Sequence, residues 1–362
     1  MTPADIASLR LWNQHLLQAD FSRPQEVVDW LVAVQSQDYT GAKWSVGQRM
    51  PTATDAVLDE AFNTGAILRT HVLRPTWHFV APADIRWLLM LTAPRVHAVN
   101  GTMYRQTGLD EAMLGQSAAI ITMALQGGNA LTRDALRDHL RQAGLDTSNL
   151  LRVTYIVMWA ELEQIICSGP RQGKQFTYML MDERVPAAAP LTYDEALTEL
   201  SRRYFRSRGP ATPADFAKWS GLTLSEARNG LEAVKNEFAQ VEAGGQVYYL
   251  PSTSLPPTAA APRAFLLSIY DEMISSYKDR SAIGEAEVGL KLLSMGNALT
   301  HIVLLEGQIV GTFRRELKTK QAVLELNLFR AVTPREDEAI VAAADQYSTF
   351  LQLPVHLIRT QP

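Results

Sequence analysis

Hydrophobic and polar positions follow helical spacing in three stretches near the start of the chain. These stretches predict helices at about residues 4–18, 24–36 and 53–63. Two short apolar runs come next, Ile67–Leu73 and Thr76–Val80, and the proline between them favours a turn. We therefore expect the N-terminal part to hold several helices followed by a two-stranded hairpin.

The order helix, tight turn, helix and hairpin is clearest in residues 209–250. Thr212 is placed to cap a helix that stops at Gly221, because a proline holds the first helical position. Thr223 and Glu226 have the three-residue spacing of a capping box, which opens a second helix. Two apolar strands around a pair of glycines complete the order of elements typical of a winged helix, a helix-turn-helix variant.

Residues 116–181 show a similar arrangement. Thr132 is placed to cap one helix, and a longer apolar helix is expected at Leu150–Glu163. The runs Gln164–Ser168 and Gln175–Leu180 then predict a second hairpin. Three units of one supersecondary type, counting the N-terminal hairpin, indicate a tandem array.

The last hundred residues have a different pattern. Residues 252–262 are rich in proline, serine and alanine and resemble a linker. Strands are expected at His301–Leu305, Gln308–Arg314 and Ala322–Leu328, followed by a helix at Arg335–Leu351. This pattern predicts a small β-rich domain with one helix.

Together these patterns predict a fold that is mainly α with β, made of tandem winged-helix units and a small C-terminal β-barrel-like domain. The expected division gives 1–110 to a first winged helix with a candidate active-site motif, 111–190 to a second, 191–255 to a third and 256–362 to the β-rich domain.

Composition restricts the class of protein without selecting a function. The chain has 362 residues, 47% of them hydrophobic, which is enough for two or three domains with buried cores. A net charge of −4 argues against a strongly basic coat protein, but local basic patches suffice for a DNA enzyme. The single cysteine, Cys167, fits a reducing cytoplasm, and no apolar run is long enough to span a membrane. The amphipathic N-terminus is unlike a secretory signal.

Metal and cofactor chemistry are not indicated. The seven histidines are scattered without the spacing of a zinc site, and the glycine-rich phosphate and dinucleotide motifs are missing. We therefore expect neither a metal nor a cofactor.

Two clusters in the first eighty residues could carry chemistry. Gln35 and Gln37 stand at the expected end of the second helix, and Trp44 and Arg49 follow closely. Glutamines at a helix end often only cap the helix or face solvent, and tryptophans are more often core than stacking surfaces, so both interpretations stay open.

The second cluster lies on the expected N-terminal hairpin and includes Arg69, Arg74, Trp77 and His78. Arg74 and His78 would share one face of a strand, since an even spacing keeps the face; they could line a site or be an ordinary polar pair.

A third candidate is a basic run without an acidic neighbour, which contains Arg202, Arg203, Arg206 and Arg208. It could be a solvated helix face or could contribute to DNA binding.

These pieces resemble the winged-helix proteins of the AlkZ and YcaQ family. The matching segments are VQSQDYTGAKWSVGQR, LRTHVLRPTWHFVAPADIRWLL, RYFRSRGPATPADFAKWSGL, YDEMISSYKDRS and EGQIVGTFRRE, in the family's order along most of the chain. The resemblance implies tandem winged helices with a β-barrel element. It also implies a bacterial DNA glycosylase that excises bulky N-alkylated purines, including interstrand crosslinks made by natural-product genotoxins.

The family's catalytic signature is glutamine, an aliphatic residue, and glutamine or aspartate. Gln35 and Gln37 match its polar positions, whereas Ser36 stands where the family has an aliphatic residue. The resemblance thus implies that the two amides orient a water molecule for hydrolysis of the N-glycosidic bond, in a monofunctional enzyme. This role requires a helix end here, because on a continuing helix the two side chains would diverge by about 200°. DNA or lesion contacts are expected from Trp44, Arg49, Arg69, Arg74, His78, Arg202, Arg203 and Arg206.

The expected partner is double-stranded DNA that carries alkylated bases, bound by a monomer. Two alternatives stay open: a non-catalytic winged-helix regulator, which would dimerise on paired half-sites, and a protein that sequesters a DNA-reactive toxin.

Overall fold

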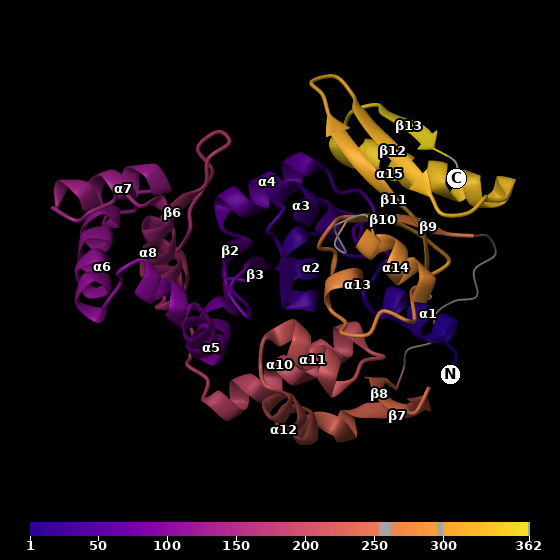
Figure 1. Ribbon diagram of the computed structural model, residues 1–362, viewed down its shortest axis with the longest axis horizontal. Coiled ribbons are helices and arrows are strands. Elements are labelled where there is room, and N and C mark those ends of the chain that lie inside the picture. Colours follow the sequence, from indigo (N-terminus) through magenta and orange to yellow (C-terminus); the bar gives the residue numbers. More distant parts are fainter. Residues whose placement is uncertain (253–261, 285, 295–299, 361–362) are drawn as a thin grey trace. The chain divides into compact units, whose positions relative to one another are not determined.

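The computed structural model describes residues 1–252, 262–284, 286–294 and 300–360, and its helices and strands are labelled in Figure 1. The chain forms two compact units. Unit 1 contains Met1–Leu58, Leu200–Trp219 and Thr223–Pro362, and unit 2 contains Asp59–Glu199 and Ser220–Leu222. Most of unit 2 is thus one long insertion in the sequence of unit 1. Helices and strands are mixed in both units, and the finer division into four consecutive domains stays a prediction.

Unit 1 begins with two short helices, a strand and a third helix. Their bounds are α1 Pro3–Asn13, α2 Pro24–Leu31, β1 Ala33–Gln35 and α3 Tyr39–Gly47. The expected helix over 24–36 is wrong beyond α2, because the next residue, Val32, has a φ of 64° and ends the helix. Helix α3 lies between the expected helices 24–36 and 53–63, in a stretch for which the sequence predicted no element.

The middle of the chain has the expected order of elements. These are α10 Tyr193–Arg208, α11 Pro213–Ser220, α12 Leu224–Val234, the 3₁₀ turn η1 Lys235–Glu237, β7 Phe238–Ala243 and β8 Gln246–Pro251. The caps predicted from sequence are confirmed: the Thr212 hydroxyl accepts from the Asp215 backbone N–H, and Thr223 and Glu226 form a capping box. Strands β7 and β8 pair antiparallel around the two glycines.

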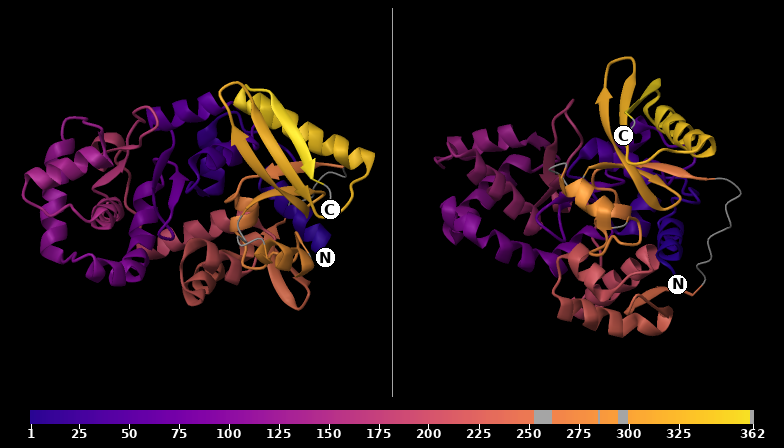
Figure 2. Two further views of the ribbon diagram at one scale, coloured as in Figure 1. Left: turned by 45° about the horizontal axis from the view of Figure 1, so that its top comes forward. Right: turned by 45° about the vertical axis from the view of Figure 1, so that its right-hand side comes forward.

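The C-terminal part of unit 1 is a five-stranded sheet with helices. The elements are β9 Ala264–Leu267, α13 Glu272–Ser275, α14 Ala286–Ser294, β10 His301–Leu305, β11 Gln308–Leu317, β12 Ala322–Leu328, α15 Pro334–Leu351 and β13 Val355–Thr360. The strand order is β13-β12-β11-β10-β9, with β12 and β13 parallel. Figure 2 shows α15 lying along this sheet. The β-rich prediction is confirmed, whereas the barrel-like closure is not; the expected linker falls mostly outside the described residues.

Helix α3 packs against α15 through aromatic rings. The Trp44 ring lies 4.8 Å from that of Tyr347 and 5.2 Å from that of Phe350, centroid to centroid. Gly47 ends α3 on the same side, where a Cβ atom would come within 2.5 Å of the Phe350 ring. The C-terminal helix therefore fixes the helix that follows the glutamine segment.

Unit 2 has a helical core with short strands. After α4 (Asp55–Thr64) the elements are β2 Leu68–His71, β3 Trp77–Val80, α5 Ile85–Gln106, α6 Glu111–Leu125, β4 Leu131–Thr132, α7 Arg133–Gln142, α8 Leu150–Leu162, β5 Ile166–Ser168, β6 Thr177–Leu180 and α9 Met181–Arg184. Leucine and isoleucine side chains from α6, α7 and α8 form one apolar cluster. The predicted cap at Thr132, the helix α8 and the hairpin β5–β6 are confirmed, and β4 adds a third strand to that hairpin.

A glycine substitution tests the packing of α3 against α15. Alanine normally stabilises a helix by up to about 1 kcal/mol relative to glycine. At Gly47 we expect Gly47→Ala to lower the free energy of unfolding by about 1–3 kcal/mol instead, because the new methyl group would overlap Phe350. Urea unfolding followed by circular dichroism measures the change.

Gly115→Ala in α6 is the matched control, since nothing lies within 4 Å of a Cβ atom there. It should be neutral or stabilising. Equal effects of the two substitutions would show that the close packing at Gly47 is absent in solution.

Candidate functional site

The glutamine segment begins in a strand and is not helical, as its expected role requires. Gln35 is the last residue of β1, and Gln37 lies in a bend just before α3. Gln35 is buried at 8% exposure, Ser36 is completely buried and Gln37 is exposed. The middle position of the motif thus faces the interior although its residue is polar. The helix end that the hypothesis demanded is present, because α2 stops at Leu31.

Glu272 in α13 holds this segment from behind. Its Oε1 accepts the backbone N–H of Gln35 at 2.9 Å. Its Oε2 accepts from Arg208 Nη2 at 2.8 Å, from Trp219 Nε1 at 2.9 Å and from Ser276 Oγ at 2.7 Å. One buried carboxylate therefore joins β1, α10, α11 and α13.

Arg208 completes the attachment of β1. Its Nη2 also donates to the carbonyl of Ala33 at 3.1 Å, and both Arg208 and Glu272 have no solvent exposure. Burial by itself would raise the pKa of Glu272, but the charge of Arg208 and the hydrogen bonds from Arg208, Ser276 and Gln35 outweigh burial and lower the pKa to about 2. Glu272 is therefore a carboxylate throughout the neutral range.

The neighbouring residue, Asp271, fixes α3 in the same way. Arg49 donates to both carboxylate oxygens of Asp271 at 3.0 Å, and to the carbonyl and the side chain of Gln14. Its guanidinium is fully buried and occupied by these partners. The expectation that Arg49 contacts DNA is corrected: in this structure it is a structural residue.

Trp44 is also buried, at 3% exposure. Its indole N–H donates to the Leu266 carbonyl at 2.6 Å, and its ring packs on α15. The expected stacking on a lesion is therefore corrected, since the ring belongs to the core of unit 1.

The second predicted cluster is only partly as expected. Arg74 lies in the turn between β2 and β3, after Leu73 with a φ of 63°, so it does not share a strand face with His78. His78 is completely buried and its Nδ1 lies 2.9 Å from the Thr76 carbonyl. We therefore remove His78 from the residues that can reach DNA, whereas Arg74 is half-buried.

Arg69 and Trp77 do meet. The guanidinium carbon of Arg69 lies 4.3 Å from the centroid of Trp77 and 4.4 Å from that of Phe176 on the β5–β6 hairpin. His71 also packs on Trp77, and its Nδ1 contacts the buried carboxylate of Glu161. This cation–aromatic cluster lies entirely within unit 2.

The basic run on α10 is not free of acidic partners, contrary to the sequence-based expectation. Arg202 pairs with Glu237 at 2.8 Å, Arg203 pairs with Asp29 at 3.0 Å, and Arg208 pairs with Glu272. The exposed Arg206 lies over the ring of Trp30 at 4.5 Å. Such surface pairs exchange easily, so Arg202, Arg203 and Arg206 remain candidates for phosphate contacts.

Sequence reasoning missed Asp271 and Glu272 as positioning residues. The segment YDEMISS was matched as a family motif without a role for its acids. Two adjacent acids beside apolar residues could have suggested buried ion pairs, but their arginine partners lie 64 and 222 residues away. In the part of the chain that the structure describes, no three metal-ligating side chains are grouped to hold an ion, and no helix is long and apolar enough to cross a membrane.

Comparisons with known proteins all give similarity to DNA glycosylases. The sequence model of a family described as DNA glycosylase AlkZ-like matches residues 28–350. The interstrand DNA cross-link repair glycosylase of Streptomyces sahachiroi is 22% identical over 330 residues, which cover 85% of this chain and 86% of that protein. The solved structure of Streptomyces sahachiroi DNA glycosylase AlkZ superposes with a TM-score of 0.75 at 20% identity, covering 99% of this chain and 100% of the other. At that identity the structural likeness shows a shared fold.

Replacing Glu272 tests the buried network. Glu272→Gln leaves Arg208 as a buried charge without its counter-ion, so we expect the free energy of unfolding at pH 7 to fall by about 3–5 kcal/mol. The low pKa of Glu272 means that the folded state favours its ionised form. Its stabilising effect is complete above its ordinary pKa of 4.5 and is lost as the pH falls towards 2, so the difference between wild type and variant should shrink over that range.

Glu336→Gln is the control for this pH dependence. The pKa of Glu336 is also about 2, mainly through its hydrogen bond from Arg330, but the pair lies at the surface where solvent screens it. Unfolding curves from pH 2 to 7 should show that the difference in stability between wild type and Glu336→Gln changes much less with pH than the difference for Glu272→Gln. A pH profile of Glu272→Gln that runs parallel to wild type would contradict the role given to Glu272.

Proposed function

Since the chain belongs to the AlkZ-like DNA glycosylase family, we propose that it excises bulky N-alkylated purines from duplex DNA by hydrolysis of the N-glycosidic bond. The relative whose name specifies interstrand cross-link repair suggests that crosslinked purines are among its substrates. The proposal assigns the catalytic role to Gln35 and Gln37.

The observation that carries this proposal is the position of Gln35 at the end of a strand whose backbone is held by a buried ion pair. The backbone of β1 is held by Glu272 and Arg208, and the helix that follows it is held by Asp271 through Arg49. The charges of these two ion pairs thus neutralise each other next to the segment, while Gln35 and Gln37 carry uncharged amides. Fixed dipoles of this kind need no reorganisation when charge develops in a reaction.

Alkylation at N7 or N3 gives a purine a positive charge, which makes it a good leaving group. As the bond from C1′ to the base breaks, its electron pair neutralises the purine and the sugar gains oxocarbenium character. Two amide carbonyls accept hydrogen bonds from a water molecule and favour the developing positive charge. The oxygen of that water bonds to C1′, its proton passes to solvent, and an abasic site remains.

Neutral amides are sufficient for a substrate whose leaving base is already positively charged. The leaving group already carries its charge, so no strong acid is required to protonate it. No lysine takes part as a nucleophile, and the enzyme is therefore monofunctional in this proposal.

For DNA binding we propose that α11, α12 and the hairpin β7–β8 act as a winged helix. The order of these elements and the two confirmed caps support this assignment. The basic side chains that we assign to phosphate or lesion contacts are Arg69, Arg74, Arg202, Arg203 and Arg206. We further propose a monomer acting in the cytoplasm, in agreement with the single, buried Cys167.

Base release tests the catalytic assignment. Wild-type protein incubated with a duplex that contains one N7-alkylguanine should create an alkali-labile abasic site. We expect Gln35→Ala and Gln37→Ala each to slow release by roughly 10²–10³, the cost of removing one pre-organised polar group from a reaction site. Borohydride should trap no covalent intermediate.

Gln142→Ala, at an exposed glutamine at the end of α7, is the matched control and should release the base at the wild-type rate. Thermal unfolding of each variant separates lost chemistry from lost folding. Equal rates for all variants would remove the two glutamines from the mechanism, and no release from several adducts by wild type would favour a non-catalytic DNA-binding protein.

A further inference from the structure

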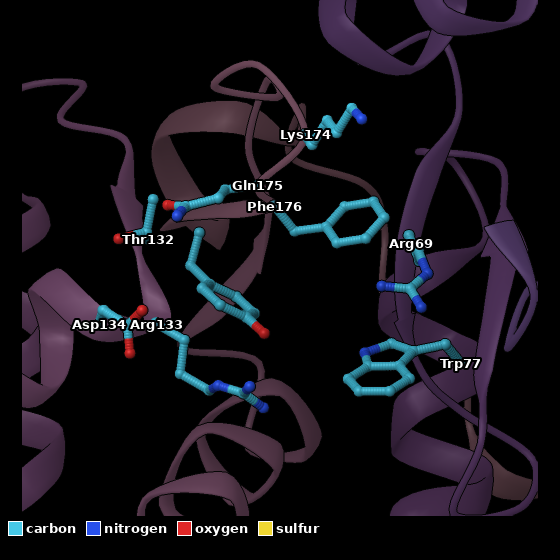
Figure 3. Close-up of a pocket in the computed structure, with 9 residues that line it drawn as sticks. Arg69, Trp77, Thr132, Arg133, Asp134, Lys174, Gln175 and Phe176 are labelled. Carbon is cyan, nitrogen blue, oxygen red and sulfur yellow. The ribbon is translucent and has the colours of Figure 1, made fainter.

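A cationic cavity lies within unit 2, apart in sequence from the glutamine segment. Its volume is about 280 Å³, just below the usual range for ligand sites, and it lies between the β2–β3 hairpin, the start of α7 and the β5–β6 hairpin. Figure 3 shows Arg69 and Trp77 on one wall and Arg133 on the opposite one, with its guanidinium directed into the space between them. Lys174 stands at the rim.

Three cations line this cavity against one carboxylate. Arg69, Arg133 and Lys174 are the cations, and Asp134 is the carboxylate. The Asp134 side chain is 68% exposed and lies 3.5 Å from Arg137, which offsets its charge. The cavity is therefore suited to an anion, in a chain whose net charge is negative.

Several donors at the cavity have no partner in the protein. Across the described part of the chain, no hydrogen bond or ion pair engages the side chains of Arg133 or Lys174, the indole N–H of Trp77 or the hydroxyl of Tyr178. Tyr178 is only 7% exposed, and its side chain lines the cavity. Burial raises the pKa of Tyr178, with a further contribution from Glu161, which keeps the hydroxyl protonated as a donor.

The wall that holds Arg69 is rigid. Its guanidinium packs on both Trp77 and Phe176, and its backbone N–H donates to the Ser168 hydroxyl at 2.8 Å. Arg69 is 6% exposed, so the rings leave only part of it accessible to a ligand. A preorganised arginine of this kind loses little entropy when it binds an oxyanion.

From these observations we propose that the cavity binds the phosphate group of a nucleotide. Phosphate has the oxygen acceptors that match two guanidinium groups, an ammonium, an indole N–H and a hydroxyl. Arg133 and Lys174 in the lining are exposed, so the cavity is open to solvent on their side. The phosphate could belong to a DNA strand or to a free nucleotide, and we favour the strand because the proposed function supplies it.

Fluorescence anisotropy with an undamaged duplex, measured over a range of salt concentrations, tests this site without requiring base release. Arg133→Ala/Lys174→Ala should weaken binding about tenfold and reduce the slope of log K against log salt by roughly 0.9 for each phosphate contact that is lost. Both side chains are exposed, so folding should be unaffected.

Arg141→Ala is the matched control on the same helix. Arg141 is 66% exposed and pairs with Asp138 away from the cavity residues, so its removal should leave the affinity and the salt slope unchanged. Tyr178→Phe removes one hydroxyl without changing the charge, and should weaken binding while the salt slope stays constant.

Titration with deoxyadenosine monophosphate, followed by calorimetry, distinguishes the two sources of phosphate. Loss of duplex affinity alone assigns the cavity to a DNA strand, and loss of mononucleotide binding alone assigns it to a free nucleotide. If neither measurement distinguishes the double variant from Arg141→Ala, the proposal is overturned, even where wild type releases an alkylated base. A salt slope that falls as expected would uphold the site even if no base were released.

Discussion

Two adjacent buried carboxylates, Asp271 and Glu272, are the constraint on which the arrangement around the glutamine segment depends. Each holds a fully buried arginine, and together they connect α3, α10, α11 and β1 to α13. Burying such ions costs several kcal/mol each, so the arrangement is stable only when every partner is present. An alternative packing that left either charge unpaired would be strongly disfavoured, which is how ion pairs of little net stability still define one geometry.

The buried ion pairs are separate from the neutral side chains of the glutamine motif. The strongest electrostatic interactions near Gln35 lie behind the strand and are satisfied within the protein. The motif itself is neutral, and its middle residue, Ser36, is buried where a larger aliphatic side chain would be the family's choice. Rigidity here comes from ion pairs on the backbone side, so the motif depends less on the size of its central side chain.

Local signals in the sequence predicted much of the fold, and contacts between distant segments explain the rest. Thr132, Thr212 and Thr223 predicted helix starts correctly, because a cap acts within three residues. The end of α2 was placed too late, since the left-handed Val32 is imposed by the surrounding structure rather than by its own preference. The sequence does not reveal Trp44 and Arg49 as core residues, because their partners on β9, α15 and the 271–272 pair are distant along the chain. The cavity at Arg133 was missed for the same reason: it needs three separate segments.

The inserted order of the two units has a consequence for synthesis on the ribosome. The first 58 residues of unit 1 emerge early, but the residues that complete their core follow only after unit 2. Arg49 awaits Asp271, 222 residues later, which at 5–20 residues per second takes about 10–45 s. During that interval the nascent N-terminal segment carries an arginine with no internal counter-ion, whereas the sequence of unit 2 is complete at Leu222, before Asp271 is reached. Unit 2 is thus the part of this protein that can fold first.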